Sequence, residues 1–297
     1  MMEMELMERE DHGGGVRGSL EVSIYHPDRQ VGWGLGVWRE MVGELVRSRE
    51  LTWRLFVRDF TARYKQSVLG ILWALIIPTV TVGTFVLLNS SGVMNVGEVN
   101  MPYPVYALLG MTIWQLFAGG LGTCSNAIIA GGSMVIKINF PRETLVLAAL
   151  GQAIADTLVR MGLLVVVFAI YGVVPQWTVI FFPFVMIPLL LLTLGLGLLF
   201  SLLGALIRDI PNIVSLATTF LLFLTPVLYP NPGEGVLGTL TAYNPLAALV
   251  TAARDVVVTG YLTQPAQYAW ATTLSVVVFL ISWRLFHMVE PRMAERV

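Results

Sequence analysis

The chain offers few side chains that could carry out chemistry. Its three histidines are scattered and its single cysteine, Cys124, has no partner, so neither a metal site nor a disulfide within the chain is expected. The only lysines are Lys65 and Lys137, and neither ends the glycine loop of a Walker A motif. The sequence therefore predicts no enzyme and no cofactor in this chain, and any ATP hydrolysis must come from another chain.

Two ionisable residues, Asp156 and Arg160, lie inside a long apolar run. A lone charge at membrane depth costs about 2.5–3.5 kcal/mol on insertion scales. Because the two residues are four positions apart, they share one helix face and can pair. We interpret them as a self-neutralising pair that faces the interior of a helix bundle. The alternative is that they line a polar translocation path or contact a partner span.

The composition explains why such charges are rare. Of the 297 residues, 56% are hydrophobic and only 12% are charged, whereas soluble domains carry roughly 25% charged residues. The mean hydropathy is +0.75 and the net charge is −1. These values exclude a disordered protein, a basic nucleic-acid binder and an ordinary soluble enzyme. The sequence predicts an all-α, polytopic membrane protein.

The apolar runs define the membrane domain. A span needs about 20 mostly apolar residues. Six stretches meet this requirement: about 69–88, 104–123, 144–173, 179–205, 212–229 and 267–287. We therefore expect a polar N-terminal extension, an amphipathic region, a six-span domain and a short cytoplasmic tail, at residues 1–33, 34–65, 66–290 and 291–297 respectively.

The amphipathic region precedes the first span. Apolar residues recur there about every three or four positions, and arginines fill the gaps. This pattern predicts a helix that lies in the membrane interface; the alternative is a helix packed on its own domain. We single out Trp38 and Phe56 among its apolar residues and Arg54, Arg58 and Arg63 among its basic ones.

The basic residues set the orientation. The flank of the first span, 47–65, holds six Lys or Arg residues, while the three segments on the opposite side hold one, Arg254. Because positive charge favours the cytoplasmic side, we predict that both termini are cytoplasmic.

The outer segment between spans five and six contains two short helix signals. Asn244 and Pro245 form a good N-cap and first turn, and the apolar run that follows, Leu246 to Val258, is too short to span. A second short piece, Gly235 to Thr241, precedes it. Together they predict a re-entrant helical hairpin in the outer leaflet.

Two cytoplasmic connections stand out. After the second span, glycines break the helix, and Pro141 and Glu143 suit the start of the next one. Arg208 and Asp209 make a tighter turn on the same side. Each connection is either a docking site for another protein or a simple link between two spans.

Aromatic residues are frequent near both membrane faces, and most are expected to be interfacial anchors. Some are candidates to stack on sugar rings in a conduit. We single out Trp73, Trp114 and Tyr229.

Several segments, taken in order, resemble ABC-2 type permeases, and most closely the polysaccharide exporters of the O-antigen and teichoic-acid type. The resemblance covers about 35–290. The segments are Glu50–Trp73, Lys137–Glu143, Arg208–Ile210, Thr225–Tyr229 and Asn244–Leu246.

The resemblance implies a homodimer of this chain bound to two copies of a separate ATPase, which would hold ATP and Mg. A lipid-linked glycan would cross the bacterial inner membrane at the permease interface. The amphipathic helix, at about 37–60, would act as a cytoplasmic gate, and the outer hairpin would shape the exit. The loop that contacts the ATPase would contain Lys137, Phe140, Pro141, Arg142 and Glu143.

Two other functions are weighed. A drug or lipid exporter of the same superfamily would share the fold and differ in substrate. A membrane enzyme or assembly factor would need a catalytic cluster at the membrane face, and the sequence shows none.

Overall fold

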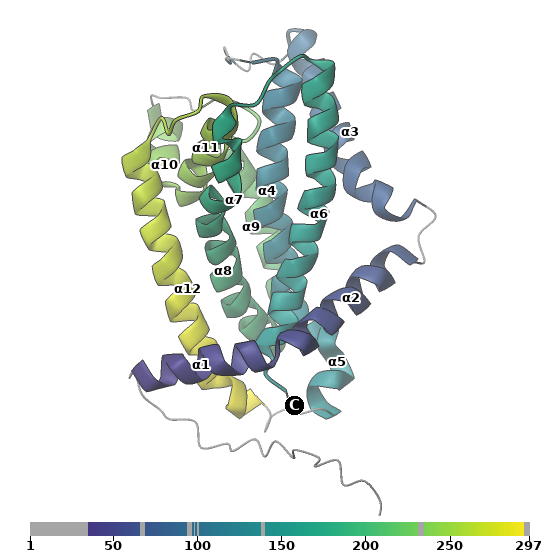
Figure 1. The fold of residues 1–297 in the computed structure, drawn as a ribbon, viewed down its shortest axis with the longest axis vertical. Helices are drawn as coiled ribbons and strands as arrows, with labels where there is room; N and C mark the ends of the chain where they lie inside the picture. The colour runs from purple at the N-terminus through teal and green to yellow at the C-terminus, as the bar shows by residue number, and fades with distance from the viewer. Residues whose placement is uncertain are drawn as a thin grey trace, which may run out of the picture. The chain divides into compact units, whose positions relative to one another are not determined.

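The computed structural model describes residues 35–65, 69–93, 97, 99, 101–137, 140–230 and 235–293. The predicted extension at 1–33 and residues 294–297 of the predicted tail lie outside this part of the chain. All described residues belong to one compact unit, Trp33–Val297. They form helices and contain no strand, which confirms the predicted all-α class within the described ranges (Figure 1).

The helices follow the order of the predicted segments. Their bounds are α1 Leu35–Arg47, α2 Arg49–Lys65, η1 Gly70–Leu72, α3 Trp73–Ser90, α4 Tyr103–Ser125, α5 Ala127–Lys137, α6 Glu143–Ile170, η2 Trp177–Phe181, α7 Phe182–Val185, α8 Ile187–Leu206, α9 Ile210–Phe223, α10 Gly235–Tyr243, α11 Pro245–Val258 and α12 Pro265–Met293.

Within the described part of the chain, five helical segments are long and apolar enough to cross a membrane. They are α3, α4, α6, the run from η2 to α8 at Trp177–Leu206, and α12. The predicted fifth span, 212–229, instead forms the 14-residue α9, about 21 Å long. The chain turns after Phe223 because Pro226 lacks an N–H and disfavours a helical residue before it.

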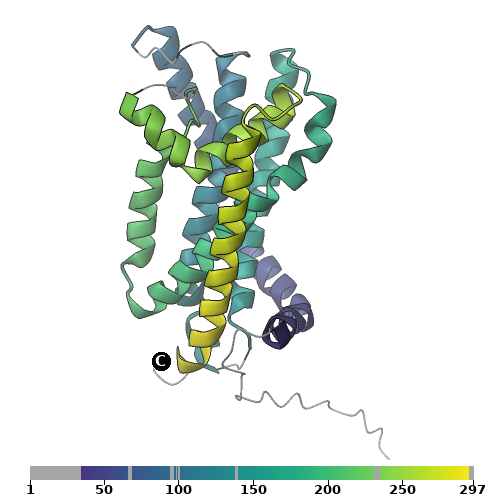
Figure 2. The same cartoon turned by 90° about the vertical axis from the view of Figure 1, so that its left-hand side faces the viewer.

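Helix α4 is the central element of the bundle. Of its apolar window, 78% is buried, compared with 17–33% for the other four segments. It packs mainly on α6 and α8, and α8 packs in turn on α12 (Figures 1 and 2). Small residues bring these helices close. A Cβ on Gly195 of α8 would lie 2.7 Å from Cα of Phe279 in α12.

Many hydroxyl groups in the described bundle donate to a carbonyl of the same helical segment. Thr112 donates to the carbonyl of Leu108 at 2.8 Å, and Thr193 donates to that of Leu189 at 2.7 Å. The same bond, from a residue to the carbonyl four positions earlier, is made by Thr79, Thr81, Thr84, Thr157, Thr218, Thr225, Thr273 and Ser275. These polar residues can therefore lie in an apolar bundle without a partner on another helix.

The amphipathic region is two helices rather than one. α1 and α2 meet at Ser48, where the chain changes direction, and α2 runs obliquely along the lower part of α6 (Figure 1). Val37 and Met41 of α1 and Leu55 of α2 are buried. One face of each helix thus packs on the bundle.

The two short helices predicted at Gly235–Thr241 and Leu246–Val258 are present as α10 and α11. The side chain of Asn244 caps α11 by accepting a hydrogen bond from the Leu246 amide at 3.0 Å. Most of α11 is buried, because it lies across the end of the bundle against α4 and α12 (Figure 2).

Candidate functional site

The end of α2 is attached to α6 by a charged hydrogen-bond network. Arg63 donates to one carboxylate oxygen of Asp156 at 3.0 Å and to Gln152 at 2.7 Å, and the Tyr64 hydroxyl donates to the other oxygen of Asp156. We call these four residues the inner clamp. Charge-assisted bonds of this kind are about twice as strong as neutral ones.

The inner clamp corrects the predicted pairing of Asp156 with Arg160. Donors from α2 take both oxygens of the carboxylate, and Arg160 has no hydrogen-bond partner among the described residues; its Nε and Nη1 are shielded from solvent. Burial and the Asp156 carboxylate raise the pKa of the Tyr64 phenol above its ordinary value, so Tyr64 stays protonated and remains a donor at neutral pH.

Two polar cavities meet at Arg63, which lines both. One, of about 350 Å³, lies among α2, α4, α5 and α6 and includes Arg58, Asn126 and Gln152. The other, of about 240 Å³, lies among α2, α3, α4 and α6 and includes Trp73 and Arg160. The Arg63 side chain therefore lies between them.

The bundle-facing side of the predicted gate is aromatic. Trp38 of α1 meets Trp283 of α12 edge to face, with ring centroids 5.8 Å apart. Phe56 of α2 packs on Gly151 of α6, where an added Cβ would lie 3.1 Å from the ring. An open groove of about 620 Å³ between α2 and α6 includes Phe56 and Gly151.

The other side of α2 is charged and exposed. Arg54 pairs with Glu50 at 2.6 Å, and Arg58 pairs with Asp59 at 2.7 Å. Arg58 also contacts the Met134 sulfur of α5 at 3.2 Å. Isolated exposed pairs contribute little to stability, so these arginines are available for other contacts.

The loop before α6 faces inward. Phe140, Arg142 and Glu143 are buried, and the Arg142 amide donates to the Glu290 carboxylate of α12 at 2.7 Å. The Arg142 guanidinium also donates to the Glu290 carbonyl at 3.3 Å. The Lys137 side chain lies outside the described part of the chain. Arg142 and Glu143 thus fix the position of the loop relative to α12.

A buried acid–imidazole cluster adjoins this loop. His287 Nδ1 lies 3.5 Å from a Glu143 oxygen and 4.0 Å from a Glu44 oxygen of α1. Ligand atoms of Glu143, His287 and Glu290 lie within 4.8 Å of one another, a spacing that a metal ion could use. Because Glu290 already accepts the Arg142 amide, we interpret the cluster as a network that joins α1, α6 and α12. Sequence spacing gave no signal for it.

A second charged network lies at the opposite end of the bundle. Arg254 of α11 is buried and donates to the Tyr106 hydroxyl at 2.7 Å, to the Pro226 carbonyl at 3.2 Å and to the Val227 carbonyl at 3.0 Å. We call these four residues the outer clamp. It fixes the Thr225–Tyr229 turn on α4, at Gly110, where a Cβ would lie 2.3 Å from the Val227 oxygen.

The role of Arg254 in the outer clamp was not predicted from the sequence. The sequence did contain a sign of this role, since Arg254 is the only basic residue in the predicted outer segments. A single arginine where positive charge is otherwise avoided needs a buried set of acceptors.

The remaining predicted residues are dispersed. Arg208 and Asp209 form an exposed turn between α8 and α9. Trp73 is 49% exposed at the start of α3, whereas Trp114 is 3% exposed and packs on Phe117 within the core. Tyr229 is partly buried and donates to the Phe223 carbonyl. Of the three aromatic candidates, only Trp73 lines one of the two polar cavities.

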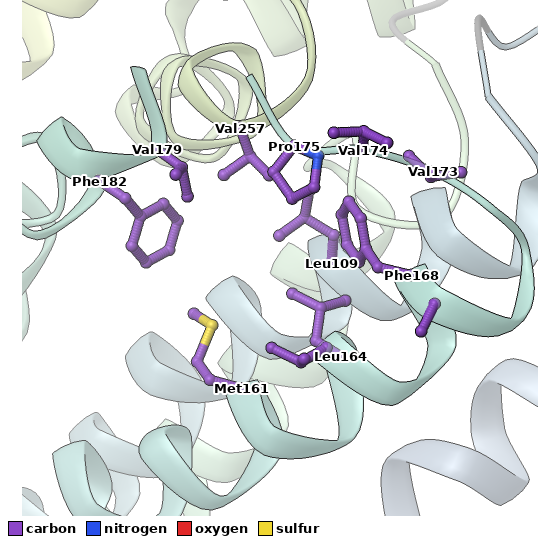
Figure 3. Close-up of a pocket in the computed structure, with 12 residues that line it drawn as sticks. Leu109, Met161, Leu164, Phe168, Val173, Val174, Pro175, Val179, Phe182 and Val257 are labelled. Atoms are coloured by element: carbon purple, nitrogen blue, oxygen red, sulfur yellow. The ribbon is translucent and has the colours of Figure 1, made fainter. Parts of the chain in front are cut away.

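An apolar pocket of about 360 Å³ lies between α4, α6, α7 and α11. Figure 3 shows Leu109, Met161, Phe168 and Val257 around it. Every side chain that lines it is apolar, so the pocket can take only an apolar group.

Comparison with known proteins agrees with the predicted resemblance. The model of the ABC-2 type transporter family matches residues 50–258. An O-antigen export system permease protein, RfbA of Myxococcus xanthus, is 28% identical over 261 residues, which cover 86% of this chain and 99% of the relative. RfbA of Klebsiella pneumoniae is 27% identical over 80% of this chain and 91% of its own length.

A further relative is the polysialic acid transport protein KpsM of Escherichia coli, which is 22% identical over 80% of this chain and 93% of its own length. The family model covers well over half of the chain, including the inner clamp and the outer clamp. The chain therefore belongs to the ABC-2 type transporter family.

Proposed function

We propose that the chain is the permease subunit of an ATP-driven exporter that moves a lipid-linked polysaccharide, of the O-antigen or teichoic-acid kind, from the cytoplasmic to the outer side of the bacterial inner membrane. The observation that carries this proposal is the family match, with O-antigen export permeases similar over nearly their full length. The five long apolar helices support a multi-pass membrane protein.

The partner is an ABC ATPase, in a complex of two permeases and two ATPases. The sequence supports a separate ATPase because neither lysine lies in a Walker A motif. The loop at Phe140–Glu143 supports coupling to it, because its bonds to α12 would pass a displacement to the rest of the bundle. The exposed turn at Arg208 and Asp209 is a second candidate contact.

The membrane topology has six crossings, with α9 as the fifth. α9 alone is shorter than a bilayer core, and the turn at Thr225–Tyr229, fixed by the outer clamp, completes the crossing. An even number of crossings leaves both termini on the same side of the membrane, and the basic flank of α3 supports the cytoplasm as that side. α10 and α11 then form the outer re-entrant hairpin.

Helices α1 and α2 lie at the cytoplasmic interface as the gate. Their inner face packs on α6 and α12 through Phe56 and Trp38, and their outer face carries Arg54 and Arg58. Arg63 separates the two polar cavities, so release of the inner clamp would join them. ATP-driven movement at the loop before α6 would reach α1 through His287, which contacts both Glu143 and Glu44 of α1.

The test is a mild-detergent purification of the tagged chain from its native membrane, with mass spectrometry of the proteins that co-purify. We expect a stoichiometric partner with a Walker A motif. Recovery of the functional chain alone would contradict the proposal. Deletion of the gene should then trap lipid-linked glycan on the cytoplasmic side; loss of export of a drug or a plain lipid, with glycan export intact, would instead support the alternative substrate.

A further inference from the structure

The smaller polar cavity carries an uncompensated positive charge. Three charged side chains line it, Arg63, Asp156 and Arg160. Asp156 is already paired with Arg63 and accepts the Tyr64 hydroxyl. The guanidinium of Arg160 is attracted by Asp156 but forms no close ion pair with it, since Arg63 occupies that carboxylate, and its Nε and Nη1 have no hydrogen-bond partner. Because burying a charge without a paired counterion costs free energy, this guanidinium favours the binding of an anion.

The cavity lies where an anionic lipid group is available. It is lined by Gly70 of η1 and by Trp73 and Ala74 at the start of α3, and it reaches Ile77 and Pro78. α3 has 18 residues and is about 27 Å long, slightly shorter than a hydrocarbon core of about 30 Å. Its first turn must therefore lie at the edge of the apolar layer. The cavity extends from that edge inward.

The surface next to the cavity is apolar and could contact the hydrocarbon chain of a lipid. Ile77 lines the cavity and is 54% exposed, and along the same helix Val80 and Leu87 are 61% and 67% exposed. A charged group in the cavity could thus continue into an apolar chain along α3. A cavity of about 240 Å³ has room for about eight waters at ~30 Å³ each, so a phosphate group fits.

We propose that this cavity binds the phosphate or diphosphate group of a lipid, with Arg160 as its counterion. A guanidinium N–H forms short, charge-assisted hydrogen bonds with phosphate oxygens. The Gln115 amide and the Trp73 indole, which line the same cavity, offer further donors. That the occupant is the phosphate-bearing lipid of the exported glycan rests on the proposed function; a membrane phospholipid presents the same chemistry.

The experiment uses the purified full-length chain in a maltoside detergent, which carries no phosphate. Undecaprenyl diphosphate, phosphatidylglycerol and undecaprenol are titrated separately, and binding is followed by native mass spectrometry. Arg160→Gln removes the counterion and Arg160→Lys keeps the charge. Arg39→Gln is the matched control, because Arg39 is exposed on α1 and lines neither polar cavity.

We expect Arg160→Gln to weaken undecaprenyl diphosphate binding about ten- to one-hundred-fold, the effect of losing a charge-assisted bond. Arg160→Lys should keep most of the affinity and Arg39→Gln nearly all of it. Without ligand, the thermal midpoint of Arg160→Gln should not fall, because Nε and Nη1 of the arginine make no hydrogen bond in the empty protein. A structural role would lower that midpoint.

Two results would overturn the proposal: equal diphosphate affinity in the unaltered chain and in Arg160→Gln, or undecaprenol binding as tight as that of the diphosphate. Phosphatidylglycerol binding with the same dependence on Arg160 would support the site and identify a membrane headgroup as an occupant. None of these titrations involves ATP or export. Failure of the site therefore leaves the proposed function intact, and failure of glycan export in cells leaves the site intact.

Discussion

Gly110 offers a sharp test of the outer clamp. A Cβ at this position would lie 2.3 Å from the Val227 oxygen and 2.4 Å from Nη2 of Arg254. Real Cβ atoms essentially never come within 3.0 Å of a neighbour, so Gly110→Ala forces a displacement of at least about 0.7 Å at a backbone carbonyl. That displacement breaks or lengthens the bond from Arg254 to Val227, which is 3.0 Å.

The cost follows from two effects. Overpacking of a well-packed interior costs about 1–3 kcal/mol, and weakening a bond to a charged donor costs about 1.5–3 kcal/mol. We expect Gly110→Ala to lower the free energy of unfolding by roughly 3–5 kcal/mol. Gly122→Ala, on the same helix, meets no atom within 4 Å and should raise it by about 0.5–1 kcal/mol, because alanine favours a helix.

Both variants are purified in the same detergent, and unfolding is followed by denaturant titration with tryptophan fluorescence. Gly110→Ala should shift the midpoint far down and Gly122→Ala slightly up. Equal shifts for the two variants would refute the reasoning, because they would show that close contact with the Val227 carbonyl does not limit the packing of α4.

Three further predictions concern the charged networks. Asp156→Asn should raise hydrogen exchange of the amides in 55–65 about ten- to one-hundred-fold by releasing Arg63, whereas Asp59→Asn, which alters an exposed pair, should leave it unchanged. Glu290→Ala should lower the glycan exported per ATP hydrolysed by the reconstituted complex, because the Arg142 amide loses its acceptor; an unchanged ratio would make the loop a plain connector. Arg254→Lys should destabilise the chain by about 1–3 kcal/mol in denaturant titration, since one ammonium cannot reach the carbonyls and the hydroxyl in the same fork geometry.

The sequence predicted the helices well because length and apolarity alone determine a membrane span. The predicted starts and ends of α4 and α6 lie within a few residues of the observed ones, and Asn244 marks the start of α11. Two features of the helices could be seen only in the structure. The bend at Ser48 divides one amphipathic pattern into two helices, and the turn after Phe223 shortens a run that is apolar to Tyr229.

The site was less predictable because its contacts are long-range. Arg63 lies 93 residues from Asp156, and no spacing rule on a single helix can pair them. The i,i+4 rule therefore assigned Asp156 to Arg160, whose guanidinium instead lines a cavity. Likewise, the predicted loop residues Arg142 and Glu143 suggested an exposed contact, but α12 covers them.

The threonine hydroxyls that donate within their own helices bear on how the bundle moves. Thr112, Thr157 and Thr193 lie in three neighbouring helices, and the bonds described for them stay intact when one helix shifts along another. Such a shift breaks none of these hydrogen bonds, so its cost is limited to the repacking of side chains between the helices. An ATPase could then move one helix along another in small steps. The inner clamp and the outer clamp, at the two ends of the bundle, would restrain this movement until their hydrogen bonds break.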